Sequence, residues 1–194
     1  QTISVINQKG GVGKTTTVIN LAAGLSQLNK KILVIDLDPQ GNATTGLGLS
    51  NMDSSSDTIY GVLNGSKEIN EVIKKTQLNN LDIVTSNVDL SGLEVETADD
   101  NNRAFILNTK LAAYLNNSGE AYDYVLIDCP PSLSLLTVMA LVCSDSLLVP
   151  LQTEFFALEG LTQLMKTIER VKVSLNQSLK IRGILLTMYD KRNK

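Results

Sequence analysis

The chain has 194 residues, of which 43% are hydrophobic and 19% charged, and its formal net charge is −3 at pH 7. One domain of about 100–200 residues accommodates this length, and the composition is that of a soluble globular protein. The chain contains no histidine, which excludes Ser-His-Asp triads and histidine-ligated metals. The negative charge excludes a basic field over the whole surface, although a local basic patch is compatible with it.

The cysteines and the most apolar stretch of the sequence indicate neither a disulfide framework, a metal site nor a membrane span. Cys129 and Cys143 are too few for a disulfide framework and have no metal-ligand partners in the sequence, so we expect buried thiols in a reducing compartment. The stretch 133–150 is interrupted by three serines and Asp145, whereas a membrane span needs about 20 largely uninterrupted apolar residues. These features predict a cytoplasmic protein with no membrane partner.

Short apolar segments alternate along the chain with longer segments in which apolar residues recur at helical spacing. The segments expected to form strands are, in chain order, Thr2–Asn7, Ile32–Asp36, Leu81–Thr85, Tyr124–Asp128, Ser146–Leu151 and Ile181–Thr187. The helical pattern occupies Val18–Leu28, Leu107–Leu115 and Leu158–Val171. Strands that are apolar on both faces are typical of parallel sheets covered by helices. The alternation predicts an α/β fold, a doubly wound and mostly parallel sheet with helices on both faces.

Two polar segments interrupt this alternation. Gly41–Ser56 is rich in Gly, Asn, Thr and Ser and is expected to be a long loop, which in a compact domain is usually functional or mobile. Glu94–Asn102 is a second polar, acidic stretch between a strand and a helix. We find no internal repeat and no interdomain linker, so we expect one domain.

The segment after the first expected strand, Gln8-Lys-Gly-Gly-Val-Gly-Lys-Thr-Thr-Thr17, leads directly into the first expected helix. This strand–glycine loop–helix order is the context of a phosphate-binding loop. The glycines let several backbone N–H groups converge on an anion, and the helix beginning at Lys14 adds the positive end of its dipole. Lys14 is placed to reach the β- and γ-phosphates, and the Thr15 hydroxyl to ligate Mg²⁺. The residues expected to contact the nucleotide are Lys9, Gly10, Gly11, Val12, Gly13, Lys14, Thr15 and Thr16. The alternative is a glycine-rich turn that binds no ligand.

The loop departs from the standard spacing at one position. Gln8 stands where the standard motif has its first glycine, and Lys9 follows it. Lys14 can point into its own nucleotide, whereas Lys9 lies on the far arm of the loop and could project to a second molecule. A cation supplied in trans to the transferring phosphate acts as an arginine finger does, so Lys9 is a candidate catalytic residue. The alternative is a solvated surface lysine.

Three carboxylates follow apolar strands. Asp36 and Asp38 come after Ile32-Leu-Val-Ile, and Asp128 ends a second such run. Because ligands bind beyond the carboxyl ends of parallel strands, we expect all three to converge on the phosphate loop. Asp128 is the candidate to hold Mg²⁺, Asp36 to support this metal site, and Asp38 to orient or deprotonate the attacking water. The alternative is that strand-end aspartates cap turns and helices.

Four segments together resemble one known family. They are Lys9–Thr17, Asp36–Thr44, Asp128-Cys-Pro-Pro-Ser132 and Gln152–Gly160. Their order and form are similar to the ParA/Soj family, deviant Walker-A ATPases that partition chromosomes and plasmids. The similarity spans the whole chain and is weakest between residues 51 and 120. It implies a P-loop NTPase fold that takes ATP with Mg²⁺.

The resemblance also implies how such a protein works. ATP binding would produce a sandwich homodimer in which Lys9 contacts the partner subunit's nucleotide and Asp38 is the hydrolytic acid. The ATP-bound dimer would bind DNA without sequence preference on the nucleoid, and a ParB-type partner would accelerate a weak ATPase. Family members continue past residue 190, including a Pro-Arg-Asn region that helps to hold the adenine. Residues 1–194 would therefore be a single P-loop ATPase domain without the family's C-terminal portion.

Positive charge is concentrated near the end of the chain, at Lys172, Lys180, Arg182, Lys191, Arg192 and Lys194. This set is either a surface that contacts DNA phosphates or a solvated face. The resemblance places part of the DNA-binding surface in the C-terminal portion.

Two other functions use a related loop. A MinD-type membrane-cycling division-site ATPase would need an amphipathic C-terminal helix, and the Asp-Pro-Gln-Gly-Asn run from Asp38 favours the partition branch instead. An ATP-dependent biosynthetic synthetase of the dethiobiotin-synthetase kind would turn over a small carboxylic acid. The stimulant of ATP hydrolysis separates these functions, because it is DNA with a basic partner peptide in one case and a small carboxylate in the other.

Overall fold

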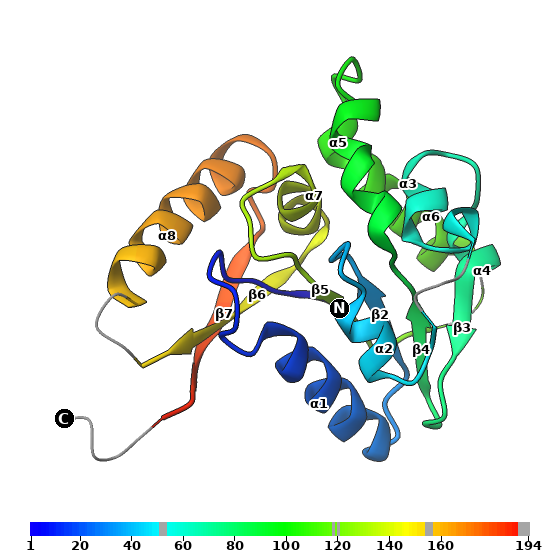
Figure 1. The fold of residues 1–194 in the computed structure, drawn as a ribbon, viewed down its shortest axis with the longest axis horizontal. Helices are drawn as coiled ribbons and strands as arrows, with labels where there is room; N and C mark the ends of the chain where they lie inside the picture. Colours follow the sequence, from blue (N-terminus) through cyan, green and yellow to red (C-terminus); the bar gives the residue numbers. More distant parts are fainter. Residues whose placement is uncertain (51–53, 118, 120, 154–156, 190–194) are drawn as a thin grey trace.

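The computed structural model describes residues 1–50, 54–117, 119, 121–153 and 157–189. Over these residues it contains a seven-stranded sheet with the order β3-β4-β2-β5-β1-β6-β7 (Figure 1). Every neighbouring pair of strands is parallel except β3 and β4. The doubly wound, mostly parallel sheet predicted from the sequence is confirmed, with one antiparallel edge strand added to it.

The six expected strands are present, with ends that differ from the prediction by two residues at most. The strands are β1 (Thr2–Val5), β2 (Ile32–Asp36), β3 (Ile73–Lys75), β4 (Leu81–Val84), β5 (Tyr124–Asp128), β6 (Ser146–Gln152) and β7 (Lys180–Thr187). Val5 of β1 and Asp36 of β2 both lie opposite Asp128 of β5. The carboxyl ends of the three central strands are therefore level, and the segments that follow them meet at one edge of the sheet.

Helices cover both faces of the sheet. They are α1 (Lys14–Gln27), α2 (Asn42–Gly46), α3 (Ile59–Leu63), α4 (Ile69–Val72), α5 (Leu93–Glu96), α6 (Ile106–Asn117), α7 (Leu135–Cys143) and α8 (Ala157–Ser174). Short 3-10 turns occupy Ser55–Asp57, Val88–Gly92 and Arg103–Phe105. One face is covered by α1, which packs through Val18 and Ala22 on β1, β2 and β4. The opposite face carries α6 and α7, and α8 packs beside α7 in a third cluster that includes Ile6.

The sequence did not indicate β3, α7 or the short helices. Eight of the nine residues of α7 are buried, so the helix shows no polar face and merges with β6 into one apolar stretch. Gly41–Ser56, expected to be a loop, instead begins with α2 and ends in a 3-10 turn, while residues 51–53 lie outside the described part. The acidic stretch Glu94–Asn102 likewise starts within α5. Each missed element is too short or too uniformly buried to show a period.

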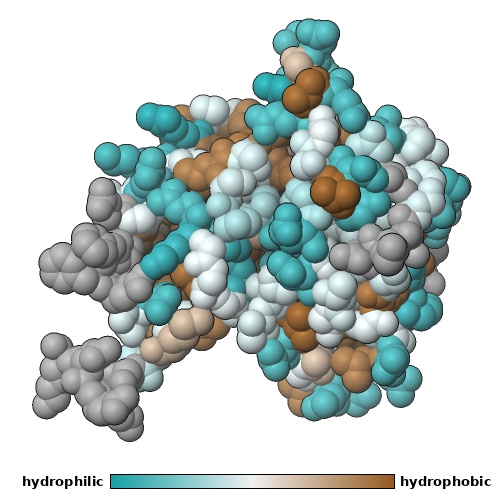
Figure 2. Space-filling model, viewed as in Figure 1, coloured by the Kyte–Doolittle hydropathy of each residue, from teal (hydrophilic) through white to brown (hydrophobic). Residues whose placement is uncertain are grey.

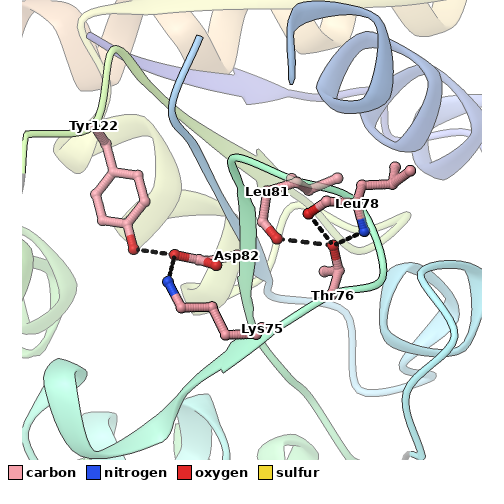
Figure 3. A network of polar contacts seen from close by, with 6 residues as sticks. All are labelled: Lys75, Thr76, Leu78, Leu81, Asp82 and Tyr122. Carbon is pink, nitrogen blue, oxygen red and sulfur yellow. Dashed lines mark hydrogen bonds and ion pairs between the residues drawn. The ribbon is translucent and has the colours of Figure 1, made fainter. Parts of the chain in front are cut away.

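A polar network fastens the antiparallel edge strand to its neighbour (Figure 3). The buried carboxylate of Asp82 in β4 accepts hydrogen bonds from Lys75 Nζ and the Tyr122 hydroxyl, each at 2.7 Å. Burial and the Asp82 carboxylate raise the pKa of Tyr122 well above its ordinary value. The Thr76 hydroxyl donates to the Leu81 carbonyl at 2.8 Å and closes the turn between β3 and β4. This network lies at the amino end of β4, away from the edge where the acidic residues gather.

Apolar surface remains at the last strand. β7 is largely exposed on both faces, with Ile184, Leu185 and Leu186 accessible to solvent. Elsewhere polar side chains cover most of the face drawn in Figure 2, and apolar side chains are visible between α7 and α8, where partly buried hydrophobic side chains pack against the third cluster. Cys129 and Cys143 are buried free thiols, as expected. No helix in the described part of the chain has the length and apolar character to cross a membrane.

Candidate nucleotide-binding site

The loop between β1 and α1 has a backbone that only glycine readily adopts. Gly11 and Gly13 have φ angles of 73° and 90°, in the left-handed region where a side chain is strained. Gly13 is also the N-cap of α1, so the unpaired N–H groups of the helix begin at Lys14. The start of the loop is fixed by Asn7, whose side chain accepts the Lys9 N–H at 3.0 Å and donates to the Pro150 carbonyl at 2.7 Å. This is the backbone form of an anion-binding nest.

Lys14 reaches back across this loop. Its ammonium donates to the Lys9 carbonyl at 3.1 Å, and the residue is only 7% exposed. Burial lowers the pKa of Lys14, and the charges of Asp128 and Asp38 oppose the shift. One buried cation therefore stands between the nest and two carboxylates, which is the arrangement expected around a bound phosphate chain. Lys9 itself is exposed.

Asp128 is fully buried, and neither carboxylate oxygen has a hydrogen-bond partner of good geometry. Burial raises the pKa of Asp128 to about 7, the nearby charge of Asp36 adds to the rise, and the Thr15 hydroxyl acts against it. A buried acid without partners is costly, and a cation is the partner that would relieve the cost. Within the described residues no three acidic or cysteine side chains form a complete metal cage. One carboxylate and one hydroxyl fit Mg²⁺, which takes most of its ligands from water and phosphate.

The Asp36 carboxylate, by contrast, accepts hydrogen bonds from the segment that follows it. Its Oδ2 accepts from the Thr44 N–H at 2.8 Å and the Thr44 hydroxyl at 2.7 Å, and its Oδ1 accepts from the Asp38 N–H at 3.2 Å. Burial raises the pKa of Asp36 to about 6 despite these bonds. The geometry is that of a cap on α2, which was the alternative function for strand-end aspartates. The carboxylate still lies close enough to Asp128 to shift its pKa.

Asp38 begins the turn between β2 and α2. It is 6% exposed, its Oδ1 accepts the Gln40 N–H at 3.0 Å, and its carbonyl accepts the Gly41 N–H at 2.9 Å. Its charge acts on Lys14, Asp36 and Asp128. The three aspartates and Lys14 are thus brought together at one edge of the sheet. Of the remaining residues expected at the nucleotide, Val12 is buried, Gly10 lies beside Pro131, and Thr16 is exposed on α1.

Thr44 is a site residue that the sequence did not single out. Its hydroxyl donates to Asp36 and accepts the Ser86 N–H at 3.0 Å, so it joins the ends of β2 and β4 through α2. Thr44 is completely buried. The sequence offered one signal: a threonine eight positions after a strand-end aspartate, in a polar segment. Lys172, Lys180 and Arg182 of the basic set are exposed, whereas Lys191, Arg192 and Lys194 lie outside the described residues.

A parallel sheet with a glycine-rich loop between its central strand and a helix, and with acids at the neighbouring strand ends, defines a P-loop NTPase. The model of a family described as an AAA domain matches residues 1–181. Over 191 residues the chain is 51% identical to the chromosome partitioning protein ParA of Caulobacter vibrioides, covering 98% of this chain and 70% of that protein. It is 46% identical to the sporulation initiation inhibitor protein Soj of Bacillus subtilis, covering 98% of this chain and 73% of Soj. The chain therefore belongs to the ParA/Soj family of partitioning ATPases, and the resemblance found in the sequence is confirmed.

A solved structure supports the same fold. The crystal structure named cobyrinic acid a,c-diamide synthase from Mycobacterium smegmatis, with bound ADP and magnesium, has a TM-score of 0.91 to this chain and is 38% identical to it. The match covers 99% of this chain and 76% of that one. The P-loop NTPase fold is therefore confirmed from both sequence and structure.

Proposed function

We propose that this protein is an ATP-dependent DNA-partition switch. It binds ATP with Mg²⁺, forms a sandwich homodimer with two nucleotides at the interface, and hydrolyses ATP to ADP and phosphate. The ATP-bound dimer binds DNA non-specifically, and a ParB-type partner stimulates an ATPase that is weak alone. The observation that carries the proposal is the unpartnered, buried Asp128 beside Thr15 and Lys14 at the mouth of the glycine loop. The names of the chromosome-partitioning relatives supply the biological setting.

The loop and Lys14 hold the phosphates in this proposal. Backbone N–H groups from Gly10 to Thr16 converge on the anion, and the Lys14 ammonium leaves the Lys9 carbonyl for the β- and γ-phosphates. Thr15 and Asp128 would hold Mg²⁺, and the nearby charge of Asp36 would add to the negative potential at this metal site. A Mg²⁺ ion held by these residues would supply positive charge against the charge that develops on the phosphates during transfer.

Asp38 orients the attacking water. It is the acid whose backbone belongs to the turn tied through Thr44 to Asp36, so movement of this turn changes its distance to the phosphate. Contacts with the γ-phosphate would order residues 38–44 and hydrolysis would release them, as in other nucleotide switches. The structure offers no histidine as an alternative base.

Lys9 completes the site of a second copy. It is exposed on the outer arm of the loop, next to the nest rather than inside it. A cation delivered across a dimer interface stabilises the charge on the transferring phosphate in the way an arginine finger does. Hydrolysis would therefore require association, which makes the protein a switch.

Sedimentation velocity with Mg²⁺ and a non-hydrolysable ATP analogue tests the proposal. The wild-type protein should sediment as a dimer, and Lys9→Ala should stay monomeric while it still binds nucleotide. Lys67→Ala is the matched control, since Lys67 is a surface lysine that pairs with Glu71 on α4. A Lys9→Ala protein that dimerises and hydrolyses ATP as well as wild type would contradict the role of Lys9, and a wild-type protein that stays monomeric would contradict the sandwich dimer.

A second candidate is an ATP-dependent biosynthetic synthetase acting on a small carboxylic acid. The structure named cobyrinic acid a,c-diamide synthase favours it, because that protein is 38% identical to this chain. ATPase assays separate the two functions. Stimulation by DNA with a ParB-type partner supports the partition switch, whereas stimulation by cobyrinic acid in the absence of DNA supports the synthetase.

A further inference from the structure

The phosphate loop is tied to the C-terminal half of the chain at two points. On its leading arm, the side-chain amide of Gln8 donates to the Gly160 carbonyl in α8 at 2.9 Å. On its trailing arm, the hydroxyl of Thr187, the last residue of β7, donates to the Val12 carbonyl at 2.8 Å. Figure 1 shows β7 passing beside the loop that precedes α1. The two contacts enclose residues 9–11, the part of the nest that carries Lys9.

The Thr187 contact fixes the rotation of one peptide unit. In a trans peptide the carbonyl and the following N–H point in opposite directions. A Val12 carbonyl held toward β7 therefore turns the Gly13 N–H away from β7. An anion nest works only when its N–H groups converge, so a hydroxyl that fixes this peptide also fixes one donor. A Cβ added to Gly13 would lie 3.6 Å from Thr187 Cγ2, which places the threonine directly against the turn.

The Gln8 contact gives a use to the residue that departs from the standard motif. A glycine at this position would have no side chain to reach α8. The amide of Gln8 approaches Gly160 so closely that a Cβ there would lie 3.4 Å from its Nε2. A second contact, at 3.5 Å, joins the same amide to the Gln163 side chain one turn later. The leading arm is thereby fastened to the first part of α8.

The elements that carry these contacts are themselves firmly placed. Leu164, Ile168 and Val171 of α8 are buried in the cluster that contains Ile6, which directly precedes the loop. β7 pairs with β6 along its length, and Thr187 lies opposite Gln152. The loop is thus held between α8, which packs into this cluster, and β7, which is hydrogen-bonded to β6.

We propose that Gln8 and Thr187 are positioning residues that brace the two arms of the phosphate loop against α8 and β7 so that its N–H groups converge. Neither side chain needs to touch the nucleotide. The nucleotide as ligand rests on the proposed function above, whereas the brace itself is a property of the protein without ligand.

Hydrogen–deuterium exchange of the loop amides and nucleotide binding test the brace together. The variants are Thr187→Val, which removes the hydroxyl at nearly constant volume, Thr187→Ser, which keeps it, and Gln8→Leu. Thr97→Val is the matched control, because Thr97 donates to the Leu93 carbonyl at 2.8 Å in α5. Thermal melting of each variant without nucleotide separates local loosening from lost stability.

Thr187→Val and Gln8→Leu should each speed exchange at residues 9–15 without nucleotide and weaken binding of a fluorescent ATP analogue with Mg²⁺ by about fivefold, the effect of one lost hydrogen bond. Thr187→Ser should restore both values, and Thr97→Val should change neither. Unchanged exchange in Thr187→Val and Gln8→Leu, or a serine variant as impaired as the valine, would overturn the brace. If exchange changes as expected but wild type binds no nucleotide, the brace stands and the proposed function fails.

Discussion

Replacing Asp128 with asparagine removes a charge that burial makes costly. Burial, and then the charge of Asp36, raise the pKa of Asp128 from 3.8 to about 7 in the folded protein. The folded state therefore binds this proton more tightly than the unfolded state, so the free energy of unfolding falls as pH rises from about 4 to about 7. Each pKa unit corresponds to about 1.4 kcal/mol. The asparagine side chain has a similar shape and does not ionise, so it escapes this loss.

The expected result is a pH-dependent gain in stability for Asp128→Asn. Between pH 5 and pH 8 its free energy of unfolding should rise relative to wild type by up to about 3 kcal/mol, the cost of the roughly two pKa units crossed in that window. Urea unfolding followed by circular dichroism, without nucleotide or Mg²⁺, measures it. The same variant should bind nucleotide with little dependence on Mg²⁺.

Asp123→Asn is the matched control for this measurement. Asp123 is exposed and accepts the Lys31 N–H at 2.8 Å, and this bond, with the charge of Lys30, lowers its pKa. Because the pKa of Asp123 is lowered, its carboxylate stabilises the folded protein fully at any pH above about 4. The free energy of unfolding of Asp123→Asn should therefore differ from that of wild type by the same amount at pH 5 and pH 8. A difference between Asp128→Asn and wild type that is also constant over this range would show that the pKa of Asp128 is not raised in the folded protein.

The remaining predictions concern three residues around the loop. Lys14→Ala should lose nucleotide affinity in calorimetric titration while it keeps its melting temperature, because burial already opposes the charge of Lys14 in the folded protein; intact affinity would contradict the loop assignment. Asp38→Ala should bind ATP and dimerise but lose hydrolysis, and equal phosphate release by wild type and variant, with DNA and partner present, would remove Asp38 from the reaction. Thr44→Val should lower the free energy of unfolding by about 1–3 kcal/mol, because the buried Ser86 N–H and the Asp36 carboxylate both lose a partner. This loss of stability should be larger at pH 8 than at pH 5, because the pKa of Asp36 rises further without the Thr44 hydroxyl. A loss that is the same at both pH values would contradict the effect of Thr44 on the Asp36 pKa.

Much of the fold could be predicted because the central strands are buried on both faces. β2 reads Ile32-Leu-Val-Ile-Asp36 without a polar interruption, and such a run followed by an acid indicates both a parallel strand and the edge where its ligand binds. The glycine loop could also be predicted from the sequence, and two of its glycines, Gly11 and Gly13, occupy positions with positive φ. These features are local, and a local pattern suffices to find them.

What the sequence could not predict depends on contacts between distant segments. Asp36 and Asp128 look alike in the sequence, because each is an acid at the end of an apolar strand. In the structure the Asp36 carboxylate accepts a hydrogen bond from Thr44, whereas the carboxylate oxygens of Asp128 have no hydrogen-bond partner of good geometry. That difference arises because α2 folds back over the end of β2. The contacts of Gln8 with α8 and of Thr187 with Val12 join residues more than 150 positions apart, and no spacing along the chain reveals them.

A crystal structure with a non-hydrolysable ATP analogue and Mg²⁺ would show whether the glycine loop binds a triphosphate. We expect triphosphate density along the N–H groups of residues 10–16, a metal ion bound near Thr15 and Asp128, and Lys9 of a second copy at the γ-phosphate. Analogue bound at another place, or a metal ion that leaves the Asp128 carboxylate without a partner, would contradict it.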